Sequence, residues 1–308
     1  MARCFVTRRL PGRALERLGA EHEVDLWPER LPPSPEQLRA RVAEAEGLLS
    51  MLTDRVDAEL LAAGPHLRVV SNYAVGVDNV DLEAARAWDV AVGNTPDVLT
   101  DATADLAFAL ILAAARRLPE GIAAVREGQW RTWEPDWLLG HDVHGATLGI
   151  VGPGRIGSAV ARRAQGFGME VLSVGREGGL DDLLARADFV SLHVPLTAET
   201  RHLIGAAELA RMKPDAYLIN TARGELVDQE ALASALHAGA IAGAALDVTD
   251  PEPFPADHPL LQSPNLIVLP HLGSATRATR ERMADLAVDN LLAGLAGRPL
   301  PHAVGLPD

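Results

Sequence analysis

The segment from Thr147 to Gly157 constrains the fold of this chain more than any other stretch. An apolar strand pattern is followed by Gly152, Gly154 and Gly157, spaced as G-x-G-x-x-G, and then by an amphipathic helix pattern. In such a turn the first glycine permits the tight bend, the second lets the backbone approach a pyrophosphate, and the third allows the helix to pack close to the strand. Because a helix N-terminus offers N–H groups to phosphate, the segment predicts a dinucleotide site.

Short apolar runs alternate with helix-length amphipathic stretches along almost the whole chain. We expect strands at residues 4–6, 24–27, 47–52, 67–72 and 90–94, and in a second series at 147–152, 170–175, 189–194, 217–220, 244–248 and 266–269. Expected helices include residues 35–45, 57–63, 82–88, 97–118 and 277–295. This alternation is typical of βαβ units, so we predict an α/β fold with parallel sheets covered by helices.

A length of 308 residues favours two domains over one. The apolar helix expected at 97–118 connects them, with hinges near residues 93–96 and 270–275. Residues 1–96 and 276–308 then form one discontinuous domain, and residues 97–275 form the other. A tryptophan-rich stretch at 130–137 has no clear period and is expected to be a loop or an arm.

The composition excludes several functional classes. The formal charge is −14 and no cluster of basic residues is present, so nucleic acid is not an expected partner. No apolar run approaches the roughly 20 residues that span a membrane, and no signal-peptide pattern follows the start, so we expect a cytoplasmic protein. Cys4, the single cysteine, predicts neither a disulfide nor a cysteine-based metal site. Lys213 is the single lysine, and the arginine richness is compatible with heat adaptation or with genome composition.

The end of the second strand of the dinucleotide unit should select the cofactor. An acidic residue there binds the ribose 2′-hydroxyl of NAD, whereas an arginine accommodates the 2′-phosphate of NADP. The sequence has Gly175 and Arg176 at this place and no carboxylate before Glu177. We therefore expect NADP(H) to be preferred, with NAD(H) as the alternative; the other reading of Arg176 is a solvated loop arginine.

Three ionisable residues, Arg223, Glu252 and His271, each follow a strand of the second series. In a doubly wound sheet, ligands bind outside the carboxyl ends of the strands, so the three should face one crevice. Reduction of a ketone needs this combination. A histidinium donates the proton to the carbonyl oxygen, a carboxylate holds the imidazole ring, and an arginine fixes a substrate carboxylate.

These motifs resemble those of the D-isomer-specific 2-hydroxyacid dehydrogenase family, and the resemblance extends over essentially the whole chain. The matching segments are residues 152–157, 220–224 and 270–274. Within the family, residues 94–101, 246–259, 271–276 and 290–294 are most similar to the glyoxylate/hydroxypyruvate reductases. The resemblance implies two doubly wound parallel-sheet domains, a flavodoxin-like substrate domain and a Rossmann dinucleotide-binding domain, with a cleft between them.

The resemblance also implies roles for individual residues. Arg223, Glu252 and His271 would be catalytic, with His271 the proton donor. Implied substrate contacts are Leu52, Val75, Gly76, Trp133, Arg223 and Ser274. Implied cofactor contacts are Thr100, Gly152, Gly154, Arg155, Ile156, Gly157, Gly175, Arg176, Pro195, Thr200, Thr221, Ala222, Asp247, His271 and Gly273. No metal is implied. Trp133 would reach into the active site of the partner subunit of a homodimer, the alternative being packing within its own subunit.

The expected activity is reduction of glyoxylate to glycolate and of hydroxypyruvate to D-glycerate by NADPH. Two alternatives stay open. One is another family member, of the D-lactate or phosphoglycerate dehydrogenase type, and the other is a dinucleotide-sensing binding protein without catalysis. The segment after Arg176 departs from the family pattern because it is short and lacks an extra strand, which leaves the strength of the NADPH preference open. The physiological keto acid, its direction of conversion and any effector are also open.

Overall fold

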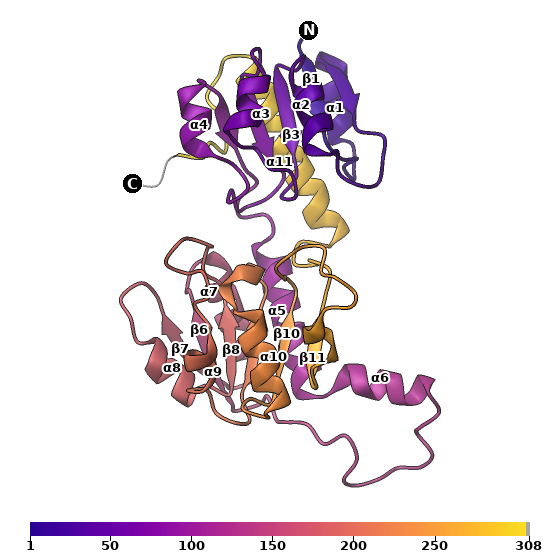
Figure 1. Ribbon diagram of the computed structural model, residues 1–308, viewed down its shortest axis with the longest axis vertical. Coiled ribbons are helices and arrows are strands. Elements are labelled where there is room, and N and C mark those ends of the chain that lie inside the picture. The colour runs from indigo at the N-terminus through magenta and orange to yellow at the C-terminus, as the bar shows by residue number, and fades with distance from the viewer. Residues whose placement is uncertain (306–308) are drawn as a thin grey trace. The chain divides into compact units, whose positions relative to one another are not determined.

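The computed structural model describes residues 1–305, which cluster into two compact units (Figure 1). The first unit contains Met1–Leu99 and the C-terminal stretch that begins at Ala275, and the second contains Thr100–Ser274. Residues 306–308, the end of the first expected domain, lie outside the described residues. The assignment of substrate binding to the first unit stays a prediction.

The first unit is built on a five-stranded parallel sheet in the order β2-β1-β3-β4-β5. The strands are β1 (Arg3–Val6), β2 (Glu23–Leu26), β3 (Gly47–Ser50), β4 (Val69–Asn72) and β5 (Ala91–Gly93). The helices are α1 (Ala14–Glu21), α2 (Pro35–Val42), α3 (Ala58–Ala63), α4 (Leu82–Ala87) and α11 (Arg277–Leu295). This strand order is that of flavodoxin-like sheets, and it reverses direction between β1 and β3.

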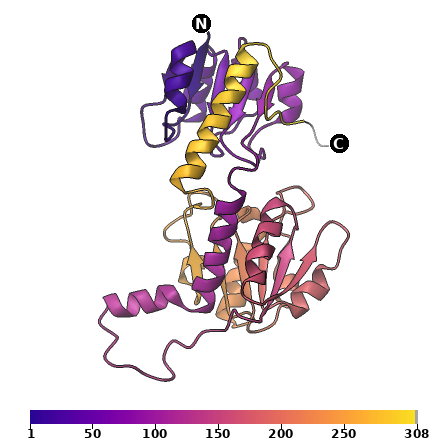
Figure 2. The ribbon, with the colours of Figure 1, turned by 180° about the vertical axis from the view of Figure 1, so that it is seen from behind.

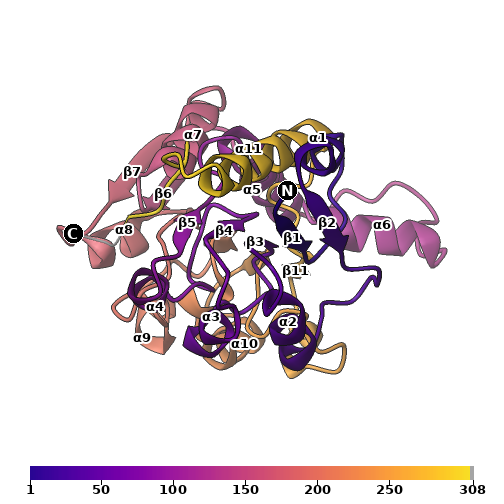
Figure 3. The same cartoon turned by 90° about the horizontal axis from the view of Figure 1, so that it is seen from above.

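Helices cover both faces of this sheet, with α2, α3 and α4 on one side and α1 and α11 on the other (Figure 3). Every residue of β3 and β4 is buried, as a strand between two helical layers requires. The helices begin at polar caps: the Ser34 hydroxyl accepts from the Gln37 N–H, and the Asp57 carboxylate accepts from the Leu60 N–H. The capping residues in the sequence therefore favour helix starts at the places where the layered structure has them.

The second unit is built on a six-stranded parallel sheet in the order β11-β10-β9-β8-β6-β7. The strands are β6 (Thr147–Val151), β7 (Glu170–Val174), β8 (Phe189–Leu192), β9 (Tyr217–Asn220), β10 (Gly243–Leu246) and β11 (Leu266–Val268). The helices are α5 (Thr100–Ala115), α6 (Leu118–Arg126), α7 (Arg155–Gln165), α8 (Leu180–Arg186), α9 (Ala206–Leu209) and α10 (Gln229–His237), with 3₁₀ turns at η1 (Gly224–Leu226) and η2 (Pro259–Gln262).

Two hydrophobic clusters fill the faces of the second sheet. Helices α5 and α7 pack on one face, and α8, α9 and α10 pack on the other. In chain order, β7 is added on one side of β6, whereas β8 and the later strands are added on its other side. The strand order therefore reverses between β6 and β8, which is the switch point of the sheet. In the described structure β7 forms an edge of the sheet. The expected α/β class with two doubly wound parallel sheets is confirmed.

The helix expected at residues 97–118 is shorter, and that prediction is wrong at both ends. Helix α5 begins at Thr100 and ends at Ala115, and a separate helix, α6, follows from Leu118. The break lies at Arg117, whose φ of 51° is left-handed, and Pro119 occupies the first turn of α6. A left-handed residue ends an α-helix, and proline is tolerated only in a first turn, so the chain starts a new helix here.

The tryptophan-rich stretch lies in the loop between α6 and β6, which contains no helix or strand. Helix α6 and this loop project from the rest of the second unit (Figure 2). The expectation of a loop or arm at 130–137 is confirmed. Within residues 1–305, no helix combines the length and the apolar character that crossing a membrane would require.

Candidate active site

The glycine-rich turn lies at the switch point of the second sheet, directly after β6. Gly152 has a φ of +95°, a conformation that side chains rarely adopt. A Cβ on Gly152 would lie 2.8 Å from the carbonyl atoms of His193, which follows β8, and a Cβ on Gly157 would lie 2.3 Å from the Gly152 oxygen. The turn is therefore packed tightly against β8 and α7. Only Gly154, the N-cap residue of α7, faces open space.

This cradle fits a dinucleotide. The first-turn N–H groups of α7 have no acceptors within the helix, and the open space beside Gly154 lets an anionic group approach them. Thr221, at the carboxyl end of β9, has a buried hydroxyl without a hydrogen-bond partner among the described residues. A buried hydroxyl of this kind is normally satisfied, so a ligand hydrogen bond would complete it. Ala222 follows Thr221 at the same sheet edge.

The end of β7, where the sequence predicts that the cofactor is selected, lies at the surface of the second unit. Ser173, Gly175 and Arg176 are exposed, and the sheet edge places no further strand beside them. A hydrogen bond from Thr197 does most to lower the pKa of Glu199, and the positive charge of Arg176 adds to that effect. Arg176 is thus close enough to the loop after β8 for its positive charge to act on Glu199. That loop is held by the Thr200 hydroxyl, which donates to the Pro195 carbonyl at 2.7 Å.

His271 and Glu252 form a hydrogen-bonded pair. The distance from His271 Nδ1 to Glu252 Oε2 is 2.8 Å, and each side chain is 27% exposed. The other carboxylate oxygen, Oε1, accepts from the Thr249 N–H at 3.1 Å. The carboxylate is therefore fixed by one backbone contact and holds one ring nitrogen, which leaves Nε2 as the nitrogen that can serve a ligand.

The Arg223 loop is packed against the turn that leads to Glu252. A Cβ on Gly224 would lie 2.0 Å from the carbonyl carbon of Thr249, so only glycine fits there. Asn220 holds the loop by two hydrogen bonds. Its side-chain amide donates to the Arg223 carbonyl at 2.7 Å, and its Oδ1 accepts from the Ala222 N–H at 3.0 Å. The half-buried Arg223 donates from Nη1 to the Ala222 carbonyl at 2.8 Å. The structure thus joins the segments of Arg223 and Glu252.

Asp247, at the end of β10, reaches the segment that carries His271. Its carboxylate oxygens each accept a backbone N–H, from Leu272 and from Gly273, both at 2.7 Å. Burial raises the pKa of the Asp247 carboxyl, and these two hydrogen bonds and the nearby His271 act in the opposite direction. Asp247 is 1% exposed, so this charge is buried and compensated mainly by backbone donors.

The predicted substrate residues Leu52, Val75 and Gly76 belong to the first unit. Leu52 is 37% exposed in the loop after β3, which is next to the switch point of that sheet. The loop after β4 is tied down through its carbonyl groups: the Asn94 amide donates to Val75 at 2.8 Å, and the Asn72 amide donates to Gly76 at 3.0 Å. Both loops follow carboxyl ends of parallel strands, where ligands bind in such sheets.

The remaining predicted residues are spread over the second unit. Thr100 is the first residue of α5, and Gly273 and Ser274 follow His271. Trp133 is 81% exposed in the projecting loop and is not part of the cluster around His271. Within residues 1–305, no group of three or more metal-ligating side chains is present.

Sequence reasoning missed two polar residues that organise these loops. Asn79 donates from its amide to the carbonyls of Met51 at 3.0 Å and Asp54 at 2.8 Å, and accepts from the Asn72 amide at 2.9 Å. It therefore joins the two candidate substrate loops. His193 is half-buried beside the glycine turn, where its Nε2 is 2.9 Å from the Ser191 hydroxyl. For His193 the available signal was a polar residue within an apolar strand pattern, whereas Asn79, seven residues after the end of β4, had no such signal.

Comparison with known proteins agrees with this geometry. Residues 108–273 match the family model described as D-isomer specific 2-hydroxyacid dehydrogenase, NAD binding domain. The chain belongs to the D-isomer-specific 2-hydroxyacid dehydrogenases. It is therefore an oxidoreductase that uses a nicotinamide dinucleotide. The resemblance stated from the sequence is confirmed.

Individual known proteins are similar to this chain over nearly their whole length. The glyoxylate reductase of Korarchaeum cryptofilum is 51% identical, over 98% of this chain and 95% of that protein. A crystal structure of a Thermus thermophilus protein, 52% identical, superposes with a TM-score of 0.93 over 98% of this chain and 100% of that one. The NADPH-dependent glyoxylate/hydroxypyruvate reductase of Sinorhizobium meliloti, in complex with NADP and malonate, is 35% identical with a TM-score of 0.85, covering 98% of this chain and 96% of that one.

Proposed function

We propose that this D-2-hydroxyacid dehydrogenase reduces glyoxylate to glycolate and hydroxypyruvate to D-glycerate, with NADPH as the preferred reductant and NADH as the alternative. The observation that carries the proposal is the 2.8 Å contact between His271 Nδ1 and Glu252 Oε2, at the sheet edge that also holds the dinucleotide cradle. The names of the similar proteins support the substrate: several are glyoxylate reductases. Two crystal structures of the Sinorhizobium meliloti enzyme support NADPH.

The chemistry assigned to each residue follows from its contacts. The bound reduced nicotinamide supplies the hydride that adds to the keto carbon. His271 donates a proton from Nε2 to the carbonyl oxygen, since its Nδ1 is engaged by Glu252. Glu252 orients the imidazole ring through this contact. Arg223 anchors the substrate carboxylate by a charge-assisted contact. The backbone of Val75 and Gly76, with Leu52 and Ser274, would complete the substrate site.

The cofactor contacts are assigned to the segments that meet at the switch point. Residues 152–157 would hold the pyrophosphate, and Arg176 would contact the 2′-phosphate, because no carboxylate stands at the end of β7. Pro195, Thr200, Thr221 and Ala222 would line the path of the dinucleotide. Thr100, Asp247, His271 and Gly273 would lie at the nicotinamide end. We assign this binding to the residues 97–275 that the sequence predicts for the dinucleotide domain.

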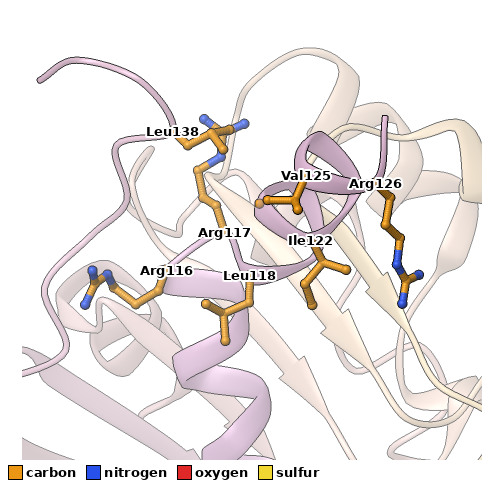
Figure 4. Close-up of a pocket in the computed structure, with 8 residues that line it drawn as sticks. Arg116, Arg117, Leu118, Ile122, Val125, Arg126 and Leu138 are labelled. Carbon is orange, nitrogen blue, oxygen red and sulfur yellow. The ribbon is translucent and has the colours of Figure 1, made fainter. Parts of the chain in front are cut away.

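A second copy of the chain is the partner that we propose. Leu118, Ile122 and Val125 form an exposed stripe on α6, and each is at least 50% exposed. With Leu138 they line a hollow that has Arg116 and Arg126 at its two ends (Figure 4). Helical spacing puts the three apolar side chains on one face, and an exposed face of this kind is typical of an interaction surface.

Trp133, 81% exposed in the loop that follows α6, would reach the active site of the partner subunit in this homodimer. The enzyme would work in the cytoplasm on a small keto acid, without nucleic acid or membrane.

Steady-state oxidation of NADPH and NADH tests the function. The substrates are glyoxylate, hydroxypyruvate, pyruvate and 3-phosphohydroxypyruvate, and His271→Ala is the control. Fast turnover of the first two with NADPH, lost in the variant, is the expected result. Higher kcat/KM for pyruvate or 3-phosphohydroxypyruvate would favour the lactate or phosphoglycerate dehydrogenase type. Absence of turnover with all pairs would contradict the reductase and favour a dinucleotide-sensing protein.

A further inference from the structure

The C-terminal segment 302–304 pairs with the edge of the first sheet. β5 is an edge strand of that sheet, and an edge strand presents N–H and carbonyl groups that need partners. The segment lies antiparallel to β5. The Val304 N–H donates to the Val92 carbonyl at 2.8 Å. The Asn94 N–H donates to the His302 carbonyl at 3.1 Å, so the pairing extends one residue past the end of β5.

Asn290, on α11, joins this C-terminal segment to the residues that follow β5. Its Oδ1 accepts from the His302 N–H at 3.1 Å, and its amide donates to the Asn94 carbonyl at 2.9 Å. The side chain is fully buried and lies against Gly93, where a Cβ would fall 2.7 Å from the Asn290 Cγ. A carboxamide supplies both the donor and the acceptor that this position requires, whereas a carboxylate or an apolar side chain does not.

Asn94 and Thr95 in turn hold the loop after β4. The Asn94 amide donates to the Val75 carbonyl at 2.8 Å. The Thr95 N–H donates to the Ala74 carbonyl, also at 2.8 Å. Two successive carbonyl groups of this loop are therefore held by the segment to which Asn290 is bound.

This anchoring sets the direction of the N–H groups that are proposed to bind the substrate carboxylate. In a planar trans peptide, the carbonyl group and the following N–H point in opposite directions. Because the carbonyls of Ala74 and Val75 are turned toward residues 94–95, the N–H groups of Val75 and Gly76 both point away from them. Among the described residues, neither N–H donates to a protein acceptor. Two successive N–H groups oriented in this way can bind one anion.

We propose that Asn290 and residues 302–304 are positioning elements for the carboxylate subsite, and that they act through Asn94 on the loop after β4. The inference rests on the proposed function, in which Val75 and Gly76 bind the carboxylate of the substrate. Donors that are held in place before binding lose little conformational freedom when the ligand arrives. A loosened loop should therefore weaken substrate binding more than it slows the chemical step.

The substitution Asn290→Ala removes both contacts of the side chain. We expect the KM for glyoxylate to rise about tenfold, whereas kcat and the Kd for NADPH, measured by fluorescence, change less than about threefold. Asn94→Ala removes the donor to the Val75 carbonyl and should have an effect of similar size. Because both residues act through the same contacts, the double variant should raise the KM little beyond either single variant. Effects that multiply, or an unchanged KM in Asn290→Ala, would overturn the proposal.

Ser34→Ala is the matched control for general stability. Ser34 caps α2, which belongs to the same unit and follows β2, at the sheet edge opposite β5. Loss of the cap lowers the stability of the unit, but the KM for glyoxylate should stay within about twofold of the wild-type value. An equal rise of the KM in Ser34→Ala and Asn290→Ala would mean that Asn290 contributes only general stability.

A second variant keeps the test open if Asn290→Ala does not fold. Val304→Pro removes the N–H that donates to the Val92 carbonyl and leaves Asn290 in place. It should loosen the C-terminal segment and raise the KM for glyoxylate about threefold or more. An unchanged KM in a folded Val304→Pro protein would also overturn the proposal.

Hydrogen exchange gives a readout that does not depend on turnover. In the unliganded wild-type protein, the amides of Asn94 and Thr95 should be protected although they lie outside the strands. In Asn290→Ala this protection should be lost while β3 stays protected. Rapid exchange of both amides in the wild type would overturn the positioning role. If the wild type shows the protection but reduces no keto acid, the proposed function fails and the anchoring by Asn290 stands.

Discussion

Gly224 lies so close to Thr249 that a Cβ on it would fall 2.0 Å from the Thr249 carbonyl carbon. This contact joins two loops that follow neighbouring strands, β9 and β10, and each loop carries one residue of the proposed catalytic set. The Thr249 N–H in turn donates to Glu252 Oε1 at 3.1 Å. The relative position of Arg223 and Glu252 therefore depends on the absence of a side chain at residue 224.

Gly224→Ala should separate these loops. A methyl group cannot fit at 2.0 Å from backbone, so we expect a loss of about 2 kcal/mol in the free energy of unfolding and a fall in kcat/KM of about 100-fold. Urea unfolding and steady-state kinetics measure the two effects. Gly19→Ala is the control, because Gly19 lies in α1 with only the Val24 side chain, at 3.9 Å, near its Cβ, and it should gain about 0.5–1 kcal/mol. Wild-type kinetics in Gly224→Ala would contradict the account.

Arg176 should determine the preference between the two cofactors. Arg176→Ala removes one charge-assisted contact, so we expect the KM for NADPH to rise about thirtyfold, which corresponds to about 2 kcal/mol, with little change for NADH. Gly175→Asp, at the preceding residue, should reverse the preference in favour of NADH, since the new carboxylate should repel the 2′-phosphate of NADPH and accept from the ribose hydroxyl of NADH. If Arg176→Ala weakens both cofactors equally, Arg176 does not read the 2′-phosphate.

Asn79 should control substrate affinity through the two loops that it joins. Asn79→Ala removes the donors to the carbonyls of Met51 and Asp54 and leaves the partner groups unsatisfied. We expect the KM for glyoxylate to rise at least about tenfold while the Kd for NADPH is unchanged. Ser50→Ala removes only the single contact to Asn72 Oδ1 at 3.1 Å and should have a smaller effect. An unchanged KM in Asn79→Ala would show that these loops do not bind the substrate.

His193 should make the protein less stable as the pH falls. Burial lowers its pKa to about 4 from the ordinary 6.5, so the unfolded chain binds a proton more readily than the folded one. Stability is therefore lost as the pH falls from about 6.5 to about 4, by roughly 3 kcal/mol in total. Urea unfolding across this range measures the loss, and His193→Gln should show a shallower dependence. Parallel pH profiles for the two proteins would contradict this assignment.

Helix α6 should hold the proposed homodimer together. Ile122→Glu places a charge in the middle of the exposed apolar stripe, so we expect a dimeric protein to become monomeric in sedimentation experiments. Leu31→Glu is the control, because Leu31 is 73% exposed in the first unit and lies outside the stripe. If Trp133 reaches the partner site, Trp133→Ala should raise the KM for hydroxypyruvate without changing the dimer. A wild-type monomer would contradict both expectations.

Much of the fold follows from patterns that are local in the chain. The strands of both sheets and the glycine turn are visible in the sequence because apolar periodicity and glycine spacing act over a few residues. The break between α5 and α6 is not visible in this way. The left-handed conformation of Arg117 carries no strong local signal, since arginine is an ordinary helix residue.

The sequence by itself determined the class of chemistry: a dinucleotide cradle at Gly152–Gly157 and ionisable residues that follow strands. It also predicted Glu252 as the partner of His271, 19 residues further along the chain. Only the tertiary structure decided how these residues are held. Three contacts join segments that lie far apart in the sequence and whose separation in space depends on strand order and register. They are those of Asp247 with residues 271–273, of Gly224 with Thr249, and of Asn79 with two loops. Local propensity does not encode that distance, because packing of the complete sheet sets it.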